Sequence, residues 1–390
     1  METKPTIIYY KKQGAGILLL GCQNTPSHLE IPREIAGLPV VTLADFAFAP
    51  KEELPIAEEK THGNLEFVEC LDEDITISTE GYLLESLFLP DTITTIGAHV
   101  FDGCKGLTSL VLPSQIVELP EYTFGNCVNL THVGLPTGLE HLGAYAFYGC
   151  LGLEHLQLPQ SLISIGKYAF YNCRNLQSIN IPPVCDNLGM GIFLNCDTVF
   201  DIALEKASHM SELVAGLNQA LRLTITFPDG KAQILLPDYQ SEYIENTPAR
   251  MLSQVHYGSG HVYRQCVGKY AVDFRQYDKL FYMAKREDAG VLALLMALGR
   301  LQYPYRLYEE YRNGYLEYIK EHFTFAVQYL LQHKEEATLE QFGDWNVYTK
   351  ENIKEVIALA QKIGKTALVG YLLQYQRVHF GEGKKKTFDL

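Results

Sequence analysis

The chain has 390 residues, of which 47% are hydrophobic and 20% are charged. These proportions are typical of folded proteins, and they exclude a disordered, collagen-like or mucin-like chain. Residues 1–205 hold 9 Lys and Arg against 25 Asp and Glu, whereas residues 206–390 hold 23 against 21. Because so acidic a first half repels phosphate backbones and anionic membranes, we expect no nucleic-acid partner.

The chain has no apparent membrane or export segment. Its longest apolar stretch, residues 291–298, is far shorter than the ~20 residues that a membrane-spanning helix needs. Residues 1–5 lack the basic and apolar build of a signal peptide. On the sequence as given we therefore expect a cytoplasmic protein without membrane insertion, or a cell-surface or secreted one if an export signal has been removed.

The N-terminal residues predict a β-hairpin. Two apolar runs rich in β-forming residues, 6–10 and 17–20, flank Gly14-Ala15-Gly16. We assign residues 1–28 to this hairpin and expect it to cap the first coil of the array that follows.

A 23-residue repeat dominates the chain from residue 85 to residue 200. It reads approximately L-x-x-L-x-L-P-x-x-L-x-x-I-G-x-Y-A-F-x-x-C-x-x-L. A repeat of this length indicates stacked coils, each of which buries its apolar face only against its neighbours. Three residue types keep one phase over five copies: Pro90, Pro113, Pro136, Pro159 and Pro182; Phe101, Phe124, Phe147, Phe170 and Phe193; and Cys104, Cys127, Cys150, Cys173 and Cys196.

Each repeat predicts one short strand followed by a turn. In residues 153–159, Leu156 and Leu158 alternate with polar residues, as in a strand with one buried face. Pro159 ends this strand because it has no N–H for a ladder. We expect residues 162–166 to turn the chain at Gly166, where glycine accepts a backbone conformation that bulkier residues resist. The regularly spaced cysteines, out of an odd total of nine, are expected to be free, buried thiols.

The array extends beyond its clearest part. Residues 29–48 look like a first, stretched repeat, and residues 49–84 like a degenerate repeat with an acidic, solvent-facing excursion. We therefore assign the array to residues 29–205.

The L-P, I-G-x-x-A-F and F-x-x-C features resemble the BspA-like subgroup of bacterial leucine-rich-repeat proteins, most specifically over residues 85–200. The resemblance implies a right-handed solenoid with a parallel sheet on its concave side, and a role in protein binding or surface interaction. The fold class that we predict is α/β: a leucine-rich-repeat solenoid of 23-residue units followed by a mainly helical C-terminal domain.

The period stops after Asp201. Residues 208–221 have helical spacing, and two alternating runs around Pro228-Asp229-Gly230 predict a hairpin, so residues 206–272 form the junction. Residues 273–390 predict a helical domain, with its last two helices resembling an ankyrin-like or other helical hairpin. The predicted helices are 275–286, 288–301, 304–333 with a break at Asn313-Gly314, 335–342, 350–363 and 365–379.

Residues 256–266 are the most enzyme-like stretch. His256, His261 and Cys266 suit a metal site or a Cys–His nucleophile pair. Strand alternation would place the two histidines on opposite faces, however, and no acidic residue lies nearby. We therefore favour a Gly-rich interdomain loop, and we expect no enzyme activity, no cofactor and no metal.

The outward positions of the repeat strands are the better candidate site. Small, neutral side chains with a few histidines and amides are more typical of a surface that binds a protein or peptide than of a catalytic pocket. The alternative is that these are only solvated sheet positions. They form two columns: Ser86, Ser109, His132, His155 and Ser178, and beside them Phe88, Val111, Gly134, Gln157 and Asn180.

An aromatic column lies elsewhere on the same coils. Tyr122, Tyr145 and Tyr168 repeat in phase, with His99 ahead of them. Such a ladder can anchor a partner or a sugar, but we favour a structural ladder that braces neighbouring coils. A protein-binding module is therefore the leading hypothesis, and a surface adhesin or carbohydrate binder is the alternative.

Overall fold

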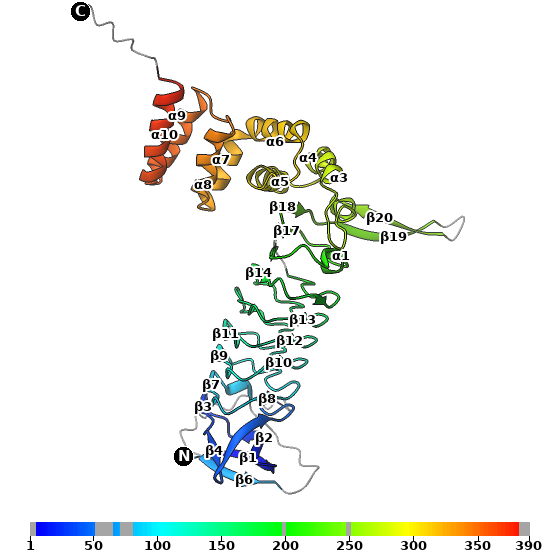
Figure 1. The fold of residues 1–390 in the computed structure, drawn as a ribbon, viewed down its shortest axis with the longest axis vertical. Coiled ribbons are helices and arrows are strands. Elements are labelled where there is room, and N and C mark those ends of the chain that lie inside the picture. The colour runs from blue at the N-terminus through cyan, green and yellow to red at the C-terminus, as the bar shows by residue number, and fades with distance from the viewer. Residues whose placement is uncertain (1–4, 51–64, 71–80, 197–199, 247–250, 382–390) are drawn as a thin grey trace, which may run out of the picture. The chain divides into compact units, whose positions relative to one another are not determined.

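The computed structural model describes residues 5–50, 65–70, 81–196, 200–246 and 251–381 (Figure 1). Most of the acidic excursion predicted within residues 49–84, and the basic tail after residue 381, lie outside these residues. The chain divides into two compact units, residues 1–277 and 278–390. Strands build the first unit and helices dominate the second, as the sequence predicts.

The first unit begins with the predicted antiparallel hairpin of β1 (Thr6–Gln13) and β2 (Gly16–Gln23). Alternate residues of β1 are buried, as expected for a strand with one face on a core. The hairpin belongs to a sheet of order β4-β5-β2-β1-β6, in which β2–β5 and β1–β6 are parallel. The other strands are β4 (Glu34–Ile35), β5 (Leu38–Leu43), β6 (Leu65–Glu69) and β8 (Thr95–Ile96), which pairs in parallel with β5.

The predicted repeat strands pair in parallel at a spacing of one repeat. Within the row, Val133 of one strand lies opposite Leu110 of the next, and both are buried. Four strands pair in the order β11-β9-β7-β3 (Figure 1). They are β3 (His28–Glu30), β7 (Ser86–Phe88), after the 3-10 turn Gly81–Leu83, β9 (Ser109–Val111) and β11 (His132–Gly134).

A second row of strands accompanies the first, where the sequence analysis expected only a turn. In residues 162–166, β13 (Ser164–Ile165) pairs in parallel with the strands one coil before and after it. Two residues are too few to show a period, so only pairing between coils reveals the strand. The row consists of β10 (Glu118–Leu119), β12 (His141–Leu142), β13 and β15 (Asn187–Leu188).

Gly166 is required for a different reason from the one predicted. It does not have a positive φ. A Cβ at this position would instead lie 2.5 Å from the backbone nitrogen of Ala144 and 2.5 Å from the carbonyl carbon of Gly143. Glycine therefore permits close approach of successive coils, not a special turn conformation.

The first row is interrupted at residues 153–159, which was predicted to be a strand. Here only an isolated bridge joins His155 to Ser178. The interruption follows Gly134, and glycine weakens strand pairing. The pairing then resumes in a sheet of order β14-β16-β17-β18: β14 (Ser178–Ile181), β16 (Phe200–Leu204), β17 (Leu221–Phe227) and β18 (Gly230–Leu236).

The Phe and Cys columns form the core of the stack, as predicted. Successive phenylalanine rings from Phe48 to Phe193 stack with centroids 5.2–5.6 Å apart, close to the ~4.8 Å between paired strands. Each repeat thiol donates to a phenylalanine carbonyl of the preceding coil, for example Cys150 Sγ to the Phe124 oxygen at 3.1 Å. All nine cysteines are buried, as predicted.

The junction differs from its prediction at residues 208–221. Only α1 (Met210–Val214) is helical, because Gly216 has a φ of 74° and Leu221 already begins β17. The predicted hairpin is present as β17 and β18. A second antiparallel pair, β19 (Gln240–Asn246) and β20 (Met251–Tyr257), precedes α2 (Gly260–Arg264).

The second unit is helical, and α3 (Phe274–Lys279) spans the boundary between the two units. The predicted break at Asn313-Gly314 is wrong: Gly314 lies inside α6, and the chain breaks at His322. Glycine in a helix costs only about 1 kcal/mol, which packing of the other residues overrides. The helices are α4 (Phe281–Glu287), α5 (Gly290–Gln302), α6 (Glu309–Glu321), α7 (Phe323–Gln332), α8 (Glu336–Asp344), α9 (Asn352–Lys362) and α10 (Thr366–His379).

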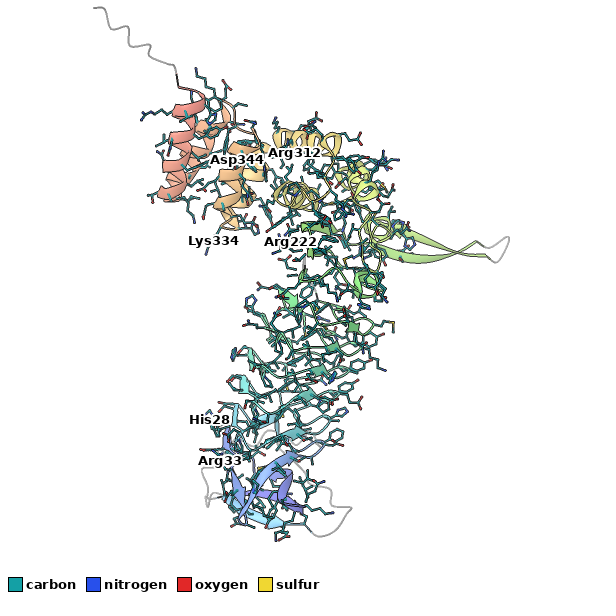
Figure 2. The ribbon with its side chains drawn as sticks, viewed as in Figure 1. His28, Arg33, Arg222, Arg312, Lys334 and Asp344 are labelled. Carbon is teal, nitrogen blue, oxygen red and sulfur yellow. The ribbon has the colours of Figure 1, made fainter. Side chains whose placement is uncertain are left out.

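The last four helices form two similar pairs. The turn between α7 and α8 contains Lys334, with a φ of 61°, and the turn between α9 and α10 contains Gly364, with a φ of 74°. Figure 2 labels Lys334 in its turn. Among the described helices, none has both the length and the apolar character that crossing a membrane requires.

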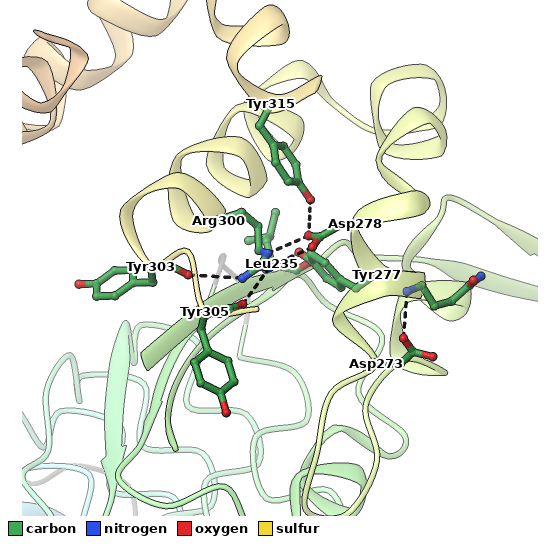
Figure 3. Close-up of polar contacts among 9 residues, drawn as sticks. Leu235, Asp273, Tyr277, Asp278, Arg300, Tyr303, Tyr305 and Tyr315 are labelled. Atoms are coloured by element: carbon green, nitrogen blue, oxygen red, sulfur yellow. Dashed lines mark hydrogen bonds and ion pairs between the residues drawn. The ribbon is translucent and has the colours of Figure 1, made fainter. Parts of the chain in front are cut away.

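A buried ion pair organises the start of the second unit (Figure 3). Arg300 and Asp278 have fully buried side chains and are joined by two hydrogen bonds of 2.8 and 2.9 Å. The Tyr315 hydroxyl donates to the same carboxylate at 2.8 Å, and the Arg300 guanidinium also donates to the carbonyl of Tyr305. These bonds satisfy charges that would otherwise be costly to bury.

We expect Phe147→Ala to destabilise the stack by about 3 to 5 kcal/mol, because it removes a buried ring that packs on both neighbouring coils. Hydrogen exchange of the full chain measures the loss as faster exchange in residues 101–193. The exposed control Val117→Ala should stay within about 0.5 kcal/mol of the parent. Equal effects of the two substitutions would contradict this account of the core.

We expect Asp278→Ala to lower the stability of the second unit by about 3 to 5 kcal/mol, because Arg300 then remains buried without its counter-ion. Trp345 is the only tryptophan and lies in this unit, so its fluorescence during denaturation reports the change. The double variant Asp278→Leu/Arg300→Met should recover most of the lost stability, because it leaves no unpaired charge in the interior. A double variant as unstable as Asp278→Ala would contradict this explanation.

Candidate functional site

The candidate site is the outward face of β3, β7, β9 and β11. The pairing register aligns the two predicted columns coil by coil. The side chains of Phe88 and Val111 are 60% and 68% exposed, although both are apolar. One column contains His28, Ser86, Ser109 and His132, and the other contains Glu30, Phe88, Val111 and Gly134.

This face contains a shallow hollow of about 570 Å³. Figure 2 labels Arg33, which lines the hollow, and His28 of β3, whose Nδ1 lies 2.7 Å from the hydroxyl of the lining residue Ser86. Arg33 forms an exposed ion pair of 3.0 Å with Asp91. The residues that line the hollow include Arg33, Ser86, Phe88, Asp91, Ser109, Val111 and His132.

Gly134 leaves space beside Val111, which lines the hollow. It lies opposite Val111 in the ladder, and a Cβ there would come within 3.2 Å of both Val111 methyl groups. The absence of a side chain at this position leaves one flank of Val111 open. The sequence analysis named Gly134 only as a member of the column and did not foresee this effect.

The remaining predicted positions belong to a second group. His155 pairs with Ser178, and Gln157 is exposed on the same coil as His155. Asn180 donates to the Glu205 carboxylate, which also accepts from the Gln160 amide at 3.2 Å. Ser178 is paired in register with Asp201 of the next strand. Asp201 forms an ion pair with Arg222, which Figure 2 labels. The structure therefore pairs His132 with Ser109 and His155 with Ser178, on separate sheets.

The aromatic ladder is longer than predicted. Phe46, His99, Tyr122, Tyr145 and Tyr168 stack with centroids 4.5–5.2 Å apart and interplanar angles of 10–23°. All five have a φ of 52–59°, a region that L residues other than glycine rarely adopt. Ring stacking offsets this strain. Because neighbouring rings cover both faces of the inner members, the ladder presents ring edges, which supports a bracing role.

Residues 256–266 are not a loop. His256 lies near the end of β20 and His261 lies in α2, so the expectation of opposite faces is wrong: the two rings stack with centroids 4.3 Å apart and an interplanar angle of 19°. Lone pairs of nearly parallel rings do not converge on one metal ion. His256 instead lies 2.7 Å from the Ser241 hydroxyl, and the buried Cys266 contacts the Val262 carbonyl oxygen. The described residues contain no cluster of three or more potential metal ligands.

Burial makes the thiols poor nucleophiles. It raises the pKa of Cys185 to about 12 and the pKa of the Cys127 and Cys173 thiols well above the ordinary value, so the thiolate fraction at neutral pH is very small. These are properties of interior side chains, not of a catalytic centre.

We expect all nine cysteines of the folded chain to resist alkylation at pH 8, because every thiol is buried and therefore inaccessible to the reagent. Mass spectrometry after brief iodoacetamide treatment should show an unmodified chain, and the same treatment in guanidinium chloride should modify nine sites. Rapid, selective modification of Cys266 in the folded chain would instead revive the nucleophile hypothesis.

The comparison with known proteins follows the repeat. Residues 80–200 match the BspA type leucine-rich repeat region in six copies. No curated protein shows a significant match. Three solved leucine-rich-repeat structures are similar. The protein from T. pallidum has 25% identity and a TM-score of 0.38 over 49% of this chain and 86% of that one.

The protein from Bacteroides ovatus has 25% identity and a TM-score of 0.31, over 45% of this chain and 48% of that one. A leucine-rich cell surface protein from Faecalibacterium prausnitzii has 18% identity and a TM-score of 0.37, over 58% and 59%. The chain thus spans less than two thirds of these two proteins. From the repeat match, residues 80–200 of this chain are a BspA-type leucine-rich-repeat region.

Proposed function

We propose that this chain is a non-enzymatic interaction protein that binds a protein or peptide partner through the outward face of β3, β7, β9 and β11. We infer that this face is the concave side of a leucine-rich-repeat solenoid. Leucine-rich-repeat proteins generally take part in protein interactions or act at surfaces, which supports a binding role.

The observation that carries this proposal is the exposure of Phe88 and Val111 on adjacent coils beside a hollow. An exposed apolar cluster with a polar rim marks an interaction site more often than a solvated surface. The polar rim here consists of Ser86, Ser109 and His132, whose hydroxyl and imidazole groups can exchange hydrogen bonds with a partner.

A protein partner fits this face better than a sugar does. Sugars pack against the open face of an aromatic ring, but the inner rings of the ladder stack on one another through both faces. Phe88 is the phenylalanine of the two outward columns, where it is exposed and lies near aliphatic Val111. This apolar character is typical of the buried centre of a protein interface.

A placed cross-linker tests this proposal in the full chain. Because all native thiols are buried, Ser109→Cys introduces a single reactive thiol on the face, and Lys167→Cys introduces one at an exposed position on a later coil of the array. After labelling with benzophenone-maleimide and irradiation in lysate of the host organism, we expect a discrete covalent adduct from the first variant.

The second variant is the matched control and should give no such adduct. An excess of unlabelled parent chain should compete the adduct away, because both forms occupy the same partner. Equal adducts from both positions, or an adduct that the parent chain does not compete, would reject binding through this face.

A further inference from the structure

We propose that Phe88, Val111 and Glu30 form the anchoring point of this face, and that the point takes a peptide segment of another protein in which a Lys or Arg stands next to an aliphatic or aromatic side chain. This inference rests on the proposed function and specifies its partner. The three residues are hereafter called the anchor cluster.

The apolar half of the anchor cluster is a small platform on two adjacent coils. β7 and β9 pair directly through Ser86 and Ser109, so Phe88 and Val111 project from neighbouring strands. The hollow extends along both strands, and Gly134 leaves the far flank of Val111 open. An aromatic side chain in a pocket near the centre of an interface is the usual form of a binding hot spot.

The acidic half of the anchor cluster lies in the same column. Glu30 is paired in register with Phe88 and is exposed, so the backbone positions of the two residues lie one strand spacing, about 4.8 Å, apart. Glu85, also exposed, precedes Ser86. At physiological salt the screening length is about 8 Å, so charges this close act on an occupant of the hollow.

Few cations compete for these carboxylates. Between residues 28 and 180 the two outward columns contain no Lys or Arg. Arg33, which lines the hollow, forms an ion pair with Asp91. Residues 1–205 carry 25 acidic and 9 basic side chains, a net charge of −16. Such a field attracts basic segments and repels acidic ones, so charge complementarity selects the occupant.

Peptide selection on the full chain tests this inference. The probe is a phage-displayed library of random 12-residue peptides, and the most enriched peptide is then synthesised and its Kd measured by fluorescence anisotropy. We expect enriched peptides to carry Lys or Arg within two positions of an aliphatic or aromatic residue, more often than the unselected library does.

Three exposed substitutions then locate the site. Phe88→Ser should weaken binding about tenfold or more, as loss of a hot-spot aromatic does. Glu30→Gln should weaken it by a few-fold and reduce its salt dependence, as loss of an exposed charge does. The control Met190→Ser removes an apolar side chain that is 63% exposed and does not line the hollow, and it should leave the Kd unchanged.

The outcomes separate this inference from the proposed function. Enriched peptides that are acidic or uncharged, or a Kd that Phe88→Ser leaves unchanged while Ser109→Tyr on the same face weakens it, would overturn the anchor cluster and leave the face as the binding surface. No enriched peptide, or a Kd that none of these face substitutions alters, would overturn both.

Discussion

The burial of each coil against the next is the interaction on which the rest of the structure depends. Each coil contributes one phenylalanine and one cysteine to the core, and the neighbouring coils bury both side chains. For example, the Phe147 ring packs between the rings of Phe124 and Phe170, and the Cys150 thiol donates a hydrogen bond to the Phe124 carbonyl. Because these inward columns supply the stability, the outward residues of the same strands are free to vary for recognition.

The sequence predicts those features of the fold that rest on residues recurring in every repeat. Phenylalanine and cysteine recur in phase over five coils, so their interior position follows from the repeat alone. The second row of strands could not be predicted in the same way, because β13 has two residues and owes its existence to β12 and β15. The reason for glycine at position 166 could not be predicted either, because it is the close approach of the backbone of the preceding coil.

The candidate site was predictable in its columns but not in its shape. Strand alternation places Ser86, Phe88, Ser109 and Val111 outward, and the register bears out that alignment. The open flank of Val111 depends on Gly134 lying opposite it, which is a relation between coils. His256 and His261 were misplaced for a related reason: the chain leaves β20 and enters α2, so strand alternation ceases to apply between them.

The two sets of aromatic side chains on the stack show how one scaffold separates stability from recognition. Tyr122, Tyr145 and Tyr168 repeat at one position, so each ring finds a ring on the next coil, and stacking covers their faces. Phe88 occupies a position where the next coils have Val111 and Gly134, so no ring covers it. Where an aromatic residue recurs at the same repeat position, its ring faces are therefore covered by the rings of the neighbouring coils. Variation at a position leaves that surface open, and in this chain it does so beside the carboxylate of Glu30.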